Sequence, residues 1–211
     1  MGSGFFVTVE GLDGSGKSTQ VSLLSEALRA DGQLVTVVRD PGTTELGERV
    51  RRLLLNPGIG APVNRWAETC LFLAARAQLF HQVIQPALEL GHTVLSDRYL
   101  DSTLAYQGAR GISWEPLLEL HRLCGLDRFP DLTLYLDIPV DRAQRRRSAT
   151  IPDRLEAEAV PYHETVRSGY LELARRFPAR VTVVPAEGRA EELAGEIRAL
   201  VWERMAEGRA I

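Results

Sequence analysis

The sequence predicts an α/β fold in which a five-stranded parallel sheet carries helices on both faces. Short β-rich runs alternate with helical stretches along the 211 residues, which is typical of such a fold. The runs are almost entirely apolar, as strands covered on both faces are. No repeat or low-complexity linker divides the chain, and its length suits one compact core. We therefore expect a single domain over residues 1–211.

The expected elements follow from these two patterns, taken in order along the chain. The strands should cover residues 5–10, 34–39, 92–96, 132–138 and 181–185. The helices should cover residues 17–30, 46–55, 66–90, 114–124, 141–147, 156–176 and 190–205. Residues 102–108 indicate only the polar start of a helix. Because helical stretches separate the strands, the strands should run parallel.

Composition excludes several classes of protein. The formal net charge of −3 gives no reason to expect a nucleic-acid partner. No apolar run reaches the ~20 residues that span a bilayer, and the N-terminus lacks the features of a signal peptide. We expect a cytoplasmic protein with no membrane partner, in which Cys70 and Cys124 are buried small hydrophobes that stay reduced.

The clearest chemical signal is residues 11–18, Gly-Leu-Asp-Gly-Ser-Gly-Lys-Ser, which fit the phosphate-binding pattern G-x-x-x-x-G-K-[ST]. The segment follows a strand and opens a helix, so backbone N–H groups and the helix N-terminus can face phosphate oxygens. Lys17, the only lysine of the chain, should reach the β- and γ-phosphates, and Ser18 should bind Mg²⁺. The expected ATP-binding residues are Gly11, Leu12, Asp13, Gly14, Ser15, Gly16, Lys17, Ser18, Thr19 and Arg142.

Other candidates lie at the end of the third strand and on the long helix. Asp97 at the strand tip is a candidate second Mg²⁺ ligand, and Arg98 follows it at the edge where open α/β sheets bind ligands. Phe72 and Arg76 are four residues apart on a helix, so they share a face that could grip a nucleobase. A capping carboxylate, a surface ion pair and a core aromatic are the ordinary alternatives.

A cluster of arginines follows the fourth strand. Arg142, Arg145, Arg146 and Arg147 could stabilise the charge that builds up during phosphoryl transfer, if a closing loop delivers them. A solvated basic face is the alternative. The polar segment 145–152 ends in proline, and we expect a mobile lid at about residues 142–153.

Together these motifs resemble bacterial thymidylate kinases from residue 5 to about residue 170. The resemblance rests on residues 10–20, 39–42, 46–51, 71–76, 97–108, 130–137 and 153–156. It implies the P-loop nucleoside monophosphate kinase fold, transfer of the γ-phosphoryl group of MgATP to dTMP in dTTP biosynthesis, and a homodimer. It also implies a cis peptide bond before Pro41.

The resemblance assigns roles to individual residues. Phe72 would stack on thymine, Arg76, Thr103 and Gln107 would hydrogen-bond the base, and Tyr106 would lie near the sugar, disfavouring a 2′-hydroxyl. The whole implied dTMP-binding set is Asp40, Pro41, Arg51, Phe72, Arg76, Arg98, Thr103, Tyr106 and Gln107. The implied catalytic set is Asp13, Lys17, Arg98, Arg145 and Arg147, and the metal ligands are Ser18 and Asp97.

The sequence departs from the family pattern in two places. Asp40 stands where the family has glutamate, and Thr43 and Thr44 follow Pro-Gly where the family has glycine and threonine. The phosphate loop contains no arginine, so the chain resembles the subclass with a catalytic arginine in the lid. Ala149 and Thr150 occupy the usual arginine-glycine place there, which leaves Arg145 and Arg147 as candidates.

Two other functions remain open at this point. One is a kinase of another nucleoside monophosphate or of a deoxynucleoside, and the other is a nucleotide-binding switch without turnover. A GTPase is disfavoured because the base-recognition motif N-K-x-D needs a second lysine, which the chain lacks.

Overall fold

The computed structural model describes residues 4–56, 58, 63–147 and 153–209. Its sheet confirms the predicted class, because five strands run parallel in the order β2-β3-β1-β4-β5. The strands are β1 (Phe5–Glu10), β2 (Val35–Arg39), β3 (Thr93–Asp97), β4 (Leu132–Asp137) and β5 (Val181–Pro185). Each lies within one residue of its predicted bounds.

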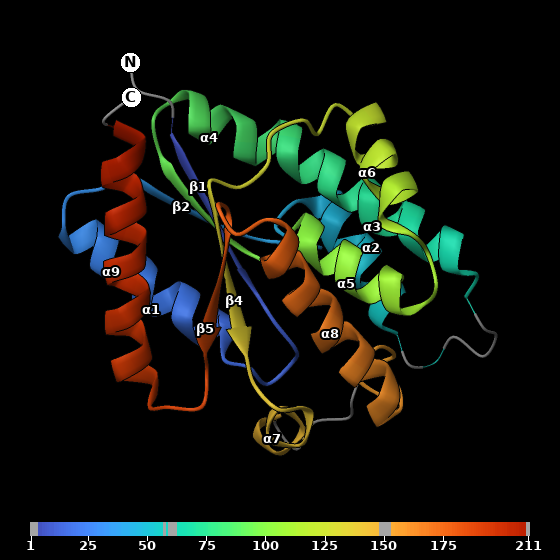
Figure 1. Cartoon of the computed structure of the whole chain (residues 1–211). Helices are drawn as coiled ribbons and strands as arrows, with labels where there is room; N and C mark the ends of the chain where they lie inside the picture. Colours follow the sequence, from blue (N-terminus) through green and yellow to red (C-terminus); the bar gives the residue numbers. More distant parts are fainter. Residues whose placement is uncertain (1–3, 57, 59–62, 148–152, 210–211) are drawn as a thin grey trace.

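Helices cover both faces of this sheet. The described α-helices are α1 (Lys17–Ala30), α2 (Glu45–Leu55), α3 (Arg65–Leu79), α4 (Gln85–Glu89), α5 (Leu100–Ala109), α6 (Trp114–Leu123), α7 (Val140–Arg146), α8 (Val160–Arg176) and α9 (Ala190–Arg209). In Figure 1, α1 and α9 lie on one side of the sheet, and α4, α5 and α8 lie on the other. Apolar side chains of β1, β3 and β4 are buried between these two layers.

The parallel arrangement brings the candidate residues to one edge. The phosphate loop leaves the carboxyl end of β1, Asp40 follows β2, Asp97 ends β3, and α7 follows β4. Because the carboxyl ends of parallel strands lie on the same side of the sheet, these segments meet there. Figure 1 shows α7 at this edge, apart from the helices that cover the faces.

The predicted helix over residues 66–90 is helical from Arg65 to Glu89 but not uniformly α-helical. A π-helical turn, η1 (Phe80–Ile84), separates α3 from α4. Pro86 lies just beyond this turn, and because proline has no backbone N–H, the regular i→i−4 pattern cannot continue through it.

Three further expectations need correction. Residues 100–109 form the complete helix α5; because α5 is buried on most sides, it lacks the one-sided apolar pattern that marks surface helices. Helix α8 begins at Val160, not at residue 156, and has a proline in its first turn. Cys70 is exposed and Cys124 is half-buried, and both are free thiols. Cys70 therefore lies on the side of α3 that faces away from the core.

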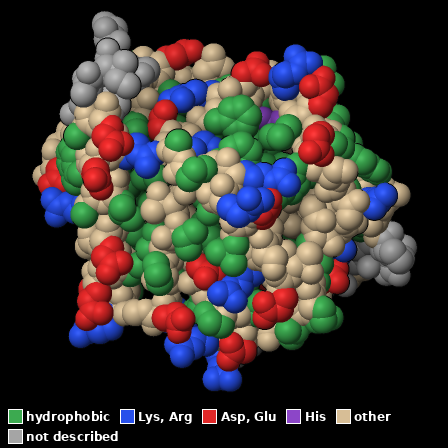
Figure 2. All heavy atoms as spheres, viewed as in Figure 1, with side chains coloured by type: hydrophobic (Ala, Val, Ile, Leu, Met, Phe, Trp, Pro, Cys, Tyr) green, Lys and Arg blue, Asp and Glu red, His purple; other side chains and the backbone are tan. Residues whose placement is uncertain are grey.

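The described surface carries both signs of charge. Figure 2 shows acidic and basic side chains interspersed over the visible face. Among the described helices, none combines the length and apolar character that crossing a membrane requires. Of the expected lid, residues 148–152, including Ala149 and Thr150, lie outside the described residues.

Candidate active site

The phosphate loop is shaped by its glycines and by helix α7, which packs against it. Gly14 has φ +90°, and a Cβ there would overlap the carbonyl oxygen of Ala143 in α7. Only glycine allows both the left-handed backbone and this close approach. Gly16, with φ 97°, is the N-cap of α1, so the helix N-terminus opens directly onto the loop.

The loop lysine lies inside the loop. Its Nζ donates a hydrogen bond of 2.9 Å to the carbonyl oxygen of Leu12 and lies 3.6 Å from Oδ1 of Asp13. Lys17 is buried, and burial lowers its pKa, with the nearby Arg98 acting in the same direction. A compact ammonium group is thus held where the loop backbone curls.

The two candidate metal ligands are in contact. Ser18, at the start of α1, donates a hydrogen bond of 2.6 Å from Oγ to Oδ2 of Asp97 at the end of β3. Both side chains line one cavity with Lys17. This places two hard oxygen ligands side by side next to the phosphate loop.

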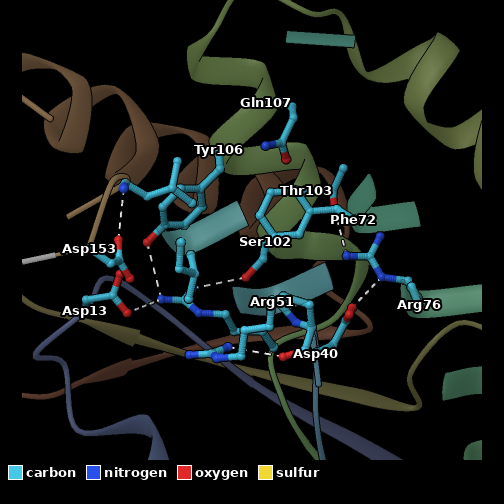
Figure 3. Close-up of a pocket in the computed structure, with 14 residues that line it drawn as sticks. Asp13, Asp40, Arg51, Phe72, Arg76, Ser102, Thr103, Tyr106, Gln107 and Asp153 are labelled. Atoms are coloured by element: carbon cyan, nitrogen blue, oxygen red, sulfur yellow. Dashed lines mark hydrogen bonds and ion pairs between the residues drawn. The ribbon is translucent and has the colours of Figure 1, made fainter. Parts of the chain in front are cut away.

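A second cavity, with an empty volume of about 500 Å³, lies beside the loop. Every residue of the implied dTMP-binding set lines this cavity (Figure 3). The lining residues are Asp13, Asp40, Pro41, Arg51, Leu55, Phe72, Arg76, Arg98, Ser102, Thr103, Tyr106, Gln107, Asp153 and Leu155. We call it the acceptor cavity.

One wall of the acceptor cavity is a buried ion pair. Arg76 Nε lies 2.5 Å from Oδ2 of Asp40, and both side chains are at most 2% exposed. Arg76 Nη2 donates to the carbonyl oxygen of Tyr99 at 3.1 Å and to Oγ1 of Thr103 at 2.7 Å. These bonds use Nε and Nη2, so among the described residues the two N–H groups of Nη1 are left for a ligand.

Arg98 joins the acceptor cavity to the phosphate loop. Its guanidinium donates to Oδ1 of Asp13 at 2.6 Å and to the carbonyl oxygen of Gly11 at 2.9 Å, and it lies 5.2 Å from the Tyr106 ring centre. Burial raises the pKa of Asp13, but Arg98 and Lys17 outweigh this effect and hold it well below its usual range. Asp13 therefore carries a negative charge that fixes Arg98.

The backbone of Arg98 is also unusual. It has φ 71°, a left-handed conformation that non-glycine residues rarely adopt. The Arg98 N–H donates to the carbonyl oxygen of Val9, and the Arg98 carbonyl accepts from Oγ of Ser96 at 2.6 Å. These contacts direct the side chain back over the phosphate loop.

Hydrogen bonds close the turn that contains Thr43 and Thr44. The Asp40–Pro41 peptide bond is cis. Oγ1 of Thr43 accepts from the backbone N–H of Arg39 at 2.8 Å, and Oγ1 of Thr44 accepts from Gly47 N at the start of α2. Thr43, which departs from the family pattern, thus closes the turn, and Thr44 caps α2.

The phosphate loop opens onto a larger cavity, with an empty volume of about 1260 Å³, which we call the donor cavity. Its lining residues are Asp13, Gly14, Gly16, Lys17, Ser18, Thr19, Arg39, Arg51, Asp97, Arg98, Arg146, Arg147 and Glu156. Of the expected ATP-binding set, Gly11, Leu12, Ser15 and Arg142 do not line it. The Gly11 and Leu12 carbonyls instead hold Arg98 and Lys17.

The arginines of α7, together with Arg147 at its C-cap, separate into two groups. Arg146 and Arg147 line the donor cavity, and Arg147 donates to the carbonyl oxygen of Glu156 at 2.9 Å. Arg142 is paired with Glu187, and Arg145 lies 3.2 Å from Asp141 with its side chain 79% exposed. The structure brings Arg147 to the site, adds Arg146, and leaves Arg142 and Arg145 outside it.

Several residues of the site carry no role in the sequence prediction. Glu10 is buried at the end of β1, where it accepts from Tyr99 N at 2.7 Å, Ser102 Oγ at 2.5 Å and Tyr170 Oη at 2.9 Å. Burial raises the pKa of Glu10 to about 7, and Asp101 adds to the rise. Its partners come from distant segments, so no local pattern could find this cluster.

Glu68 on α3 is a second missed residue, and here the sequence does hold a signal. It lies four residues before Phe72 and eight before Arg76, and therefore on the same helix face. It accepts hydrogen bonds from Gln107 and Arg110 and is paired with Arg154.

Comparisons with known proteins identify the family to which this site belongs. The family model described as thymidylate kinase matches residues 9–197. The thymidylate kinase of Pelotomaculum thermopropionicum is 49% identical over 193 residues, covering 90% of this chain and 88% of that protein. The one from Deinococcus radiodurans is 45% identical over 206 residues, covering 97% and 99%.

A solved structure agrees. The crystal structure of thymidylate kinase from Ehrlichia chaffeensis matches with a TM-score of 0.76 and 30% identity, covering 95% of this chain and 99% of that one. The sequence matches run along most of the chain and include the phosphate loop and both cavity walls. This chain therefore belongs to the thymidylate kinase family.

Proposed function

We propose that the chain transfers the γ-phosphoryl group of ATP to dTMP, giving dTDP and ADP, a step of dTTP biosynthesis. The observation that carries the proposal is that the two cavities adjoin: Asp13, Arg51 and Arg98 line both. A nucleoside monophosphate in the acceptor cavity would thus direct its phosphate toward the phosphate loop.

The reaction needs positioning and positive charge more than covalent chemistry. A phosphate oxygen of dTMP attacks the γ-phosphorus, and the bond from that phosphorus to the bridging oxygen breaks as ADP leaves. Arg98 and Arg51 hold the acceptor phosphate, and Asp13 fixes Arg98. Lys17 and the loop N–H groups stabilise the charge on the transferred group.

Ser18 and Asp97 fit a magnesium site. Mg²⁺ in kinases takes one or two protein oxygens and completes its shell with phosphate oxygens and water, and the Ser18–Asp97 pair offers such oxygens beside Lys17. Bound there, the ion would neutralise charge on the β- and γ-phosphates. The chain itself supplies the pair that holds it.

Arg147 is the arginine that we assign to the transferred phosphoryl group. It lines the donor cavity, whereas Arg145 is exposed and paired with Asp141. Residues 142–153 would act as a lid of this single domain and would carry Arg147 to the transferred group. A lid that excludes water would prevent ATP hydrolysis.

A cytoplasmic location and a homodimer complete the proposal. Both cysteines are free thiols, which suits a reducing compartment. Exposed apolar side chains on α2 and α3, namely Leu46, Leu53 and Trp66, offer a surface that a second copy could cover. Sedimentation of the purified chain would give the oligomeric state directly.

The function is tested by ADP release from MgATP with a panel of nucleoside monophosphates and deoxynucleosides. We expect dTMP to give the highest kcat/KM by a wide margin. A preference for another acceptor would favour a different nucleotide kinase, and ATP binding without turnover would favour a nucleotide switch.

A further inference from the structure

A buried carboxylate lies behind the base end of the acceptor cavity. Glu68 on α3 is 1% exposed, and it is not one of the cavity-lining residues. Its Oε1 accepts from Gln107 Nε2 at 3.1 Å and from Arg110 Nε at 2.9 Å. Its Oε2 is paired with Nη2 of Arg154.

This arrangement fixes the amide of Gln107. An amide has a donor end and an acceptor end of nearly the same shape, so its neighbours decide which end points where. A carboxylate paired with two guanidinium groups only accepts hydrogen bonds. The NH₂ group of Gln107 must therefore face Glu68, and its oxygen must face the other way.

The oxygen of Gln107 is thereby presented to the ligand. Gln107 is 1% exposed and lines the acceptor cavity, and no described residue donates to its Oε1. Figure 3 shows this oxygen on the side of the amide nearer Phe72 and Thr103. The cavity thus offers one fixed acceptor at Gln107 and donors at Nη1 of Arg76.

This pattern selects one type of pyrimidine edge. A thymine or uracil ring has an N3–H donor beside a keto acceptor, which matches Gln107 Oε1 and the Arg76 guanidinium. Cytosine presents an acceptor at N3 and an amino donor beside it, so both contacts would be mismatched. Leaving buried polar groups unpaired in this way strongly disfavours a ligand.

We propose that Glu68 determines base specificity: it orients the Gln107 amide so that the acceptor cavity takes the imide edge of thymine and rejects cytosine. Glu68 is a positioning residue, because it acts through Gln107 and not on the substrate. The inference deepens the proposed function and rests on it.

The other partners of Glu68 do not depend on it alone. Arg110 also pairs with Glu158 at 2.8 Å and lies 5.0 Å from the Tyr162 ring centre. Arg154 also donates to the carbonyl oxygen of Leu54 at 3.0 Å. Among the described residues, Glu68 is the only hydrogen-bond acceptor for the Gln107 NH₂ group, so losing this bond frees the amide to turn over.

The test is Glu68→Gln, which keeps the size of the side chain but can donate as well as accept. The measurement is kcat/KM with MgATP for dTMP and for dCMP, with inhibition constants for dCMP where turnover is too slow. We expect the dTMP-to-dCMP ratio to fall about ten- to hundredfold, with kcat for dTMP changed less than about threefold. A folded variant that keeps the ratio of the unaltered chain overturns the proposal.

Asp101→Asn is the matched control. Asp101 is also 1% exposed and paired with an arginine, Arg180, at 2.6 Å, but it does not line the acceptor cavity. Asp101→Asn should lower the free energy of unfolding but leave the dTMP-to-dCMP ratio of kcat/KM unchanged. An equal loss of ratio in the control would mean that any buried ion pair has this effect, which contradicts the role of Glu68.

A second measurement uses the unaltered chain, in case Glu68→Gln does not fold. A crystal structure with dTMP should show Glu68 accepting from Gln107 Nε2, and Gln107 Oε1 within hydrogen-bond distance of thymine N3. A reversed amide, or Glu68 turned away from Gln107, would overturn the proposal. Absence of dTMP turnover by the unaltered chain would instead refute the proposed function.

Discussion

The acceptor and donor cavities share three residues but differ in how far they are already assembled. The acceptor cavity has an empty volume of about 500 Å³, and buried hydrogen bonds hold its wall, such as Arg76 to Asp40 and Gln107 to Glu68. The donor cavity is larger, with an empty volume of about 1260 Å³. Arg146 and Arg147 line it, whereas Arg142 and Arg145 lie outside it in exposed ion pairs.

Specificity and catalysis therefore depend on different parts of the molecule. Because hydrogen bonds between the chain's own side chains hold the wall of the acceptor cavity, we expect little further ordering when dTMP binds. The donor cavity has the phosphate loop in place but only part of its positive charge. We expect substrate choice to depend on the buried wall and phosphoryl transfer to depend on the loop and α7.

The largest expected effect is that of Lys17→Ala on the donor side. Removing the only ammonium group of the phosphate loop should lower kcat by about 1,000-fold or more. Binding of dTMP should stay within about threefold, because the Arg76 wall is untouched. Steady-state kinetics and calorimetry measure the two quantities. A variant with near-full activity would remove the loop from the mechanism.

The next effect concerns the acceptor wall. Asp40→Asn leaves Arg76 buried without its charge partner, which should lower the free energy of unfolding by about 3 kcal/mol and weaken dTMP binding. Glu45→Gln is the control, because the Glu45–Arg49 pair is exposed at both side chains and should change stability by less than about 0.5 kcal/mol. Urea denaturation compares them, and equal losses would contradict a preassembled wall.

Arg147→Met should sharpen the assignment on α7. We expect kcat to fall about a hundredfold with little change in the KM for dTMP. Arg145→Met is the matched variant, and it should change kcat less than about threefold. The reverse order would show that Arg145 moves to the transferred group during the reaction.

The smallest effect is a pH dependence of stability. Burial raises the pKa of Glu10 to about 7 in the folded chain, from 4.5, so folding favours the protonated form. Stability from this group is full below about pH 4.5 and is lost as pH rises toward 7. From pH 5.5 to 8, the unfolding free energy should fall about 2 kcal/mol relative to Glu10→Gln. A difference that stays constant with pH would contradict this.

The sequence predicts much of the fold and the outline of the site. Apolar strands, helical periodicity and the phosphate-loop pattern are local signals, so the five strands and the loop follow from them. The sequence predicts only part of helix α5, because burial on most sides removes the amphipathic pattern. The pairing of Arg76 with Asp40 joins residues 36 apart in sequence, which no local pattern records.

The same limit applies to the two buried glutamates. The hydrogen-bond donors to Glu10 and Glu68 lie on α5, on α8 and near residue 154. Only the folded chain brings these donors together around the two carboxylates. The sequence also cannot rank the arginines of α7. Their positions relative to the donor cavity depend on the rotation of one short helix.

We infer that the acceptor cavity selects thymine independently of the donor cavity. Calorimetric titration of the unaltered chain with dTMP and with dCMP, without ATP or Mg²⁺, tests it most directly. We expect dTMP to bind at least about a hundredfold more tightly than dCMP. Equal affinities, or binding of dTMP only after ATP is added, would contradict it.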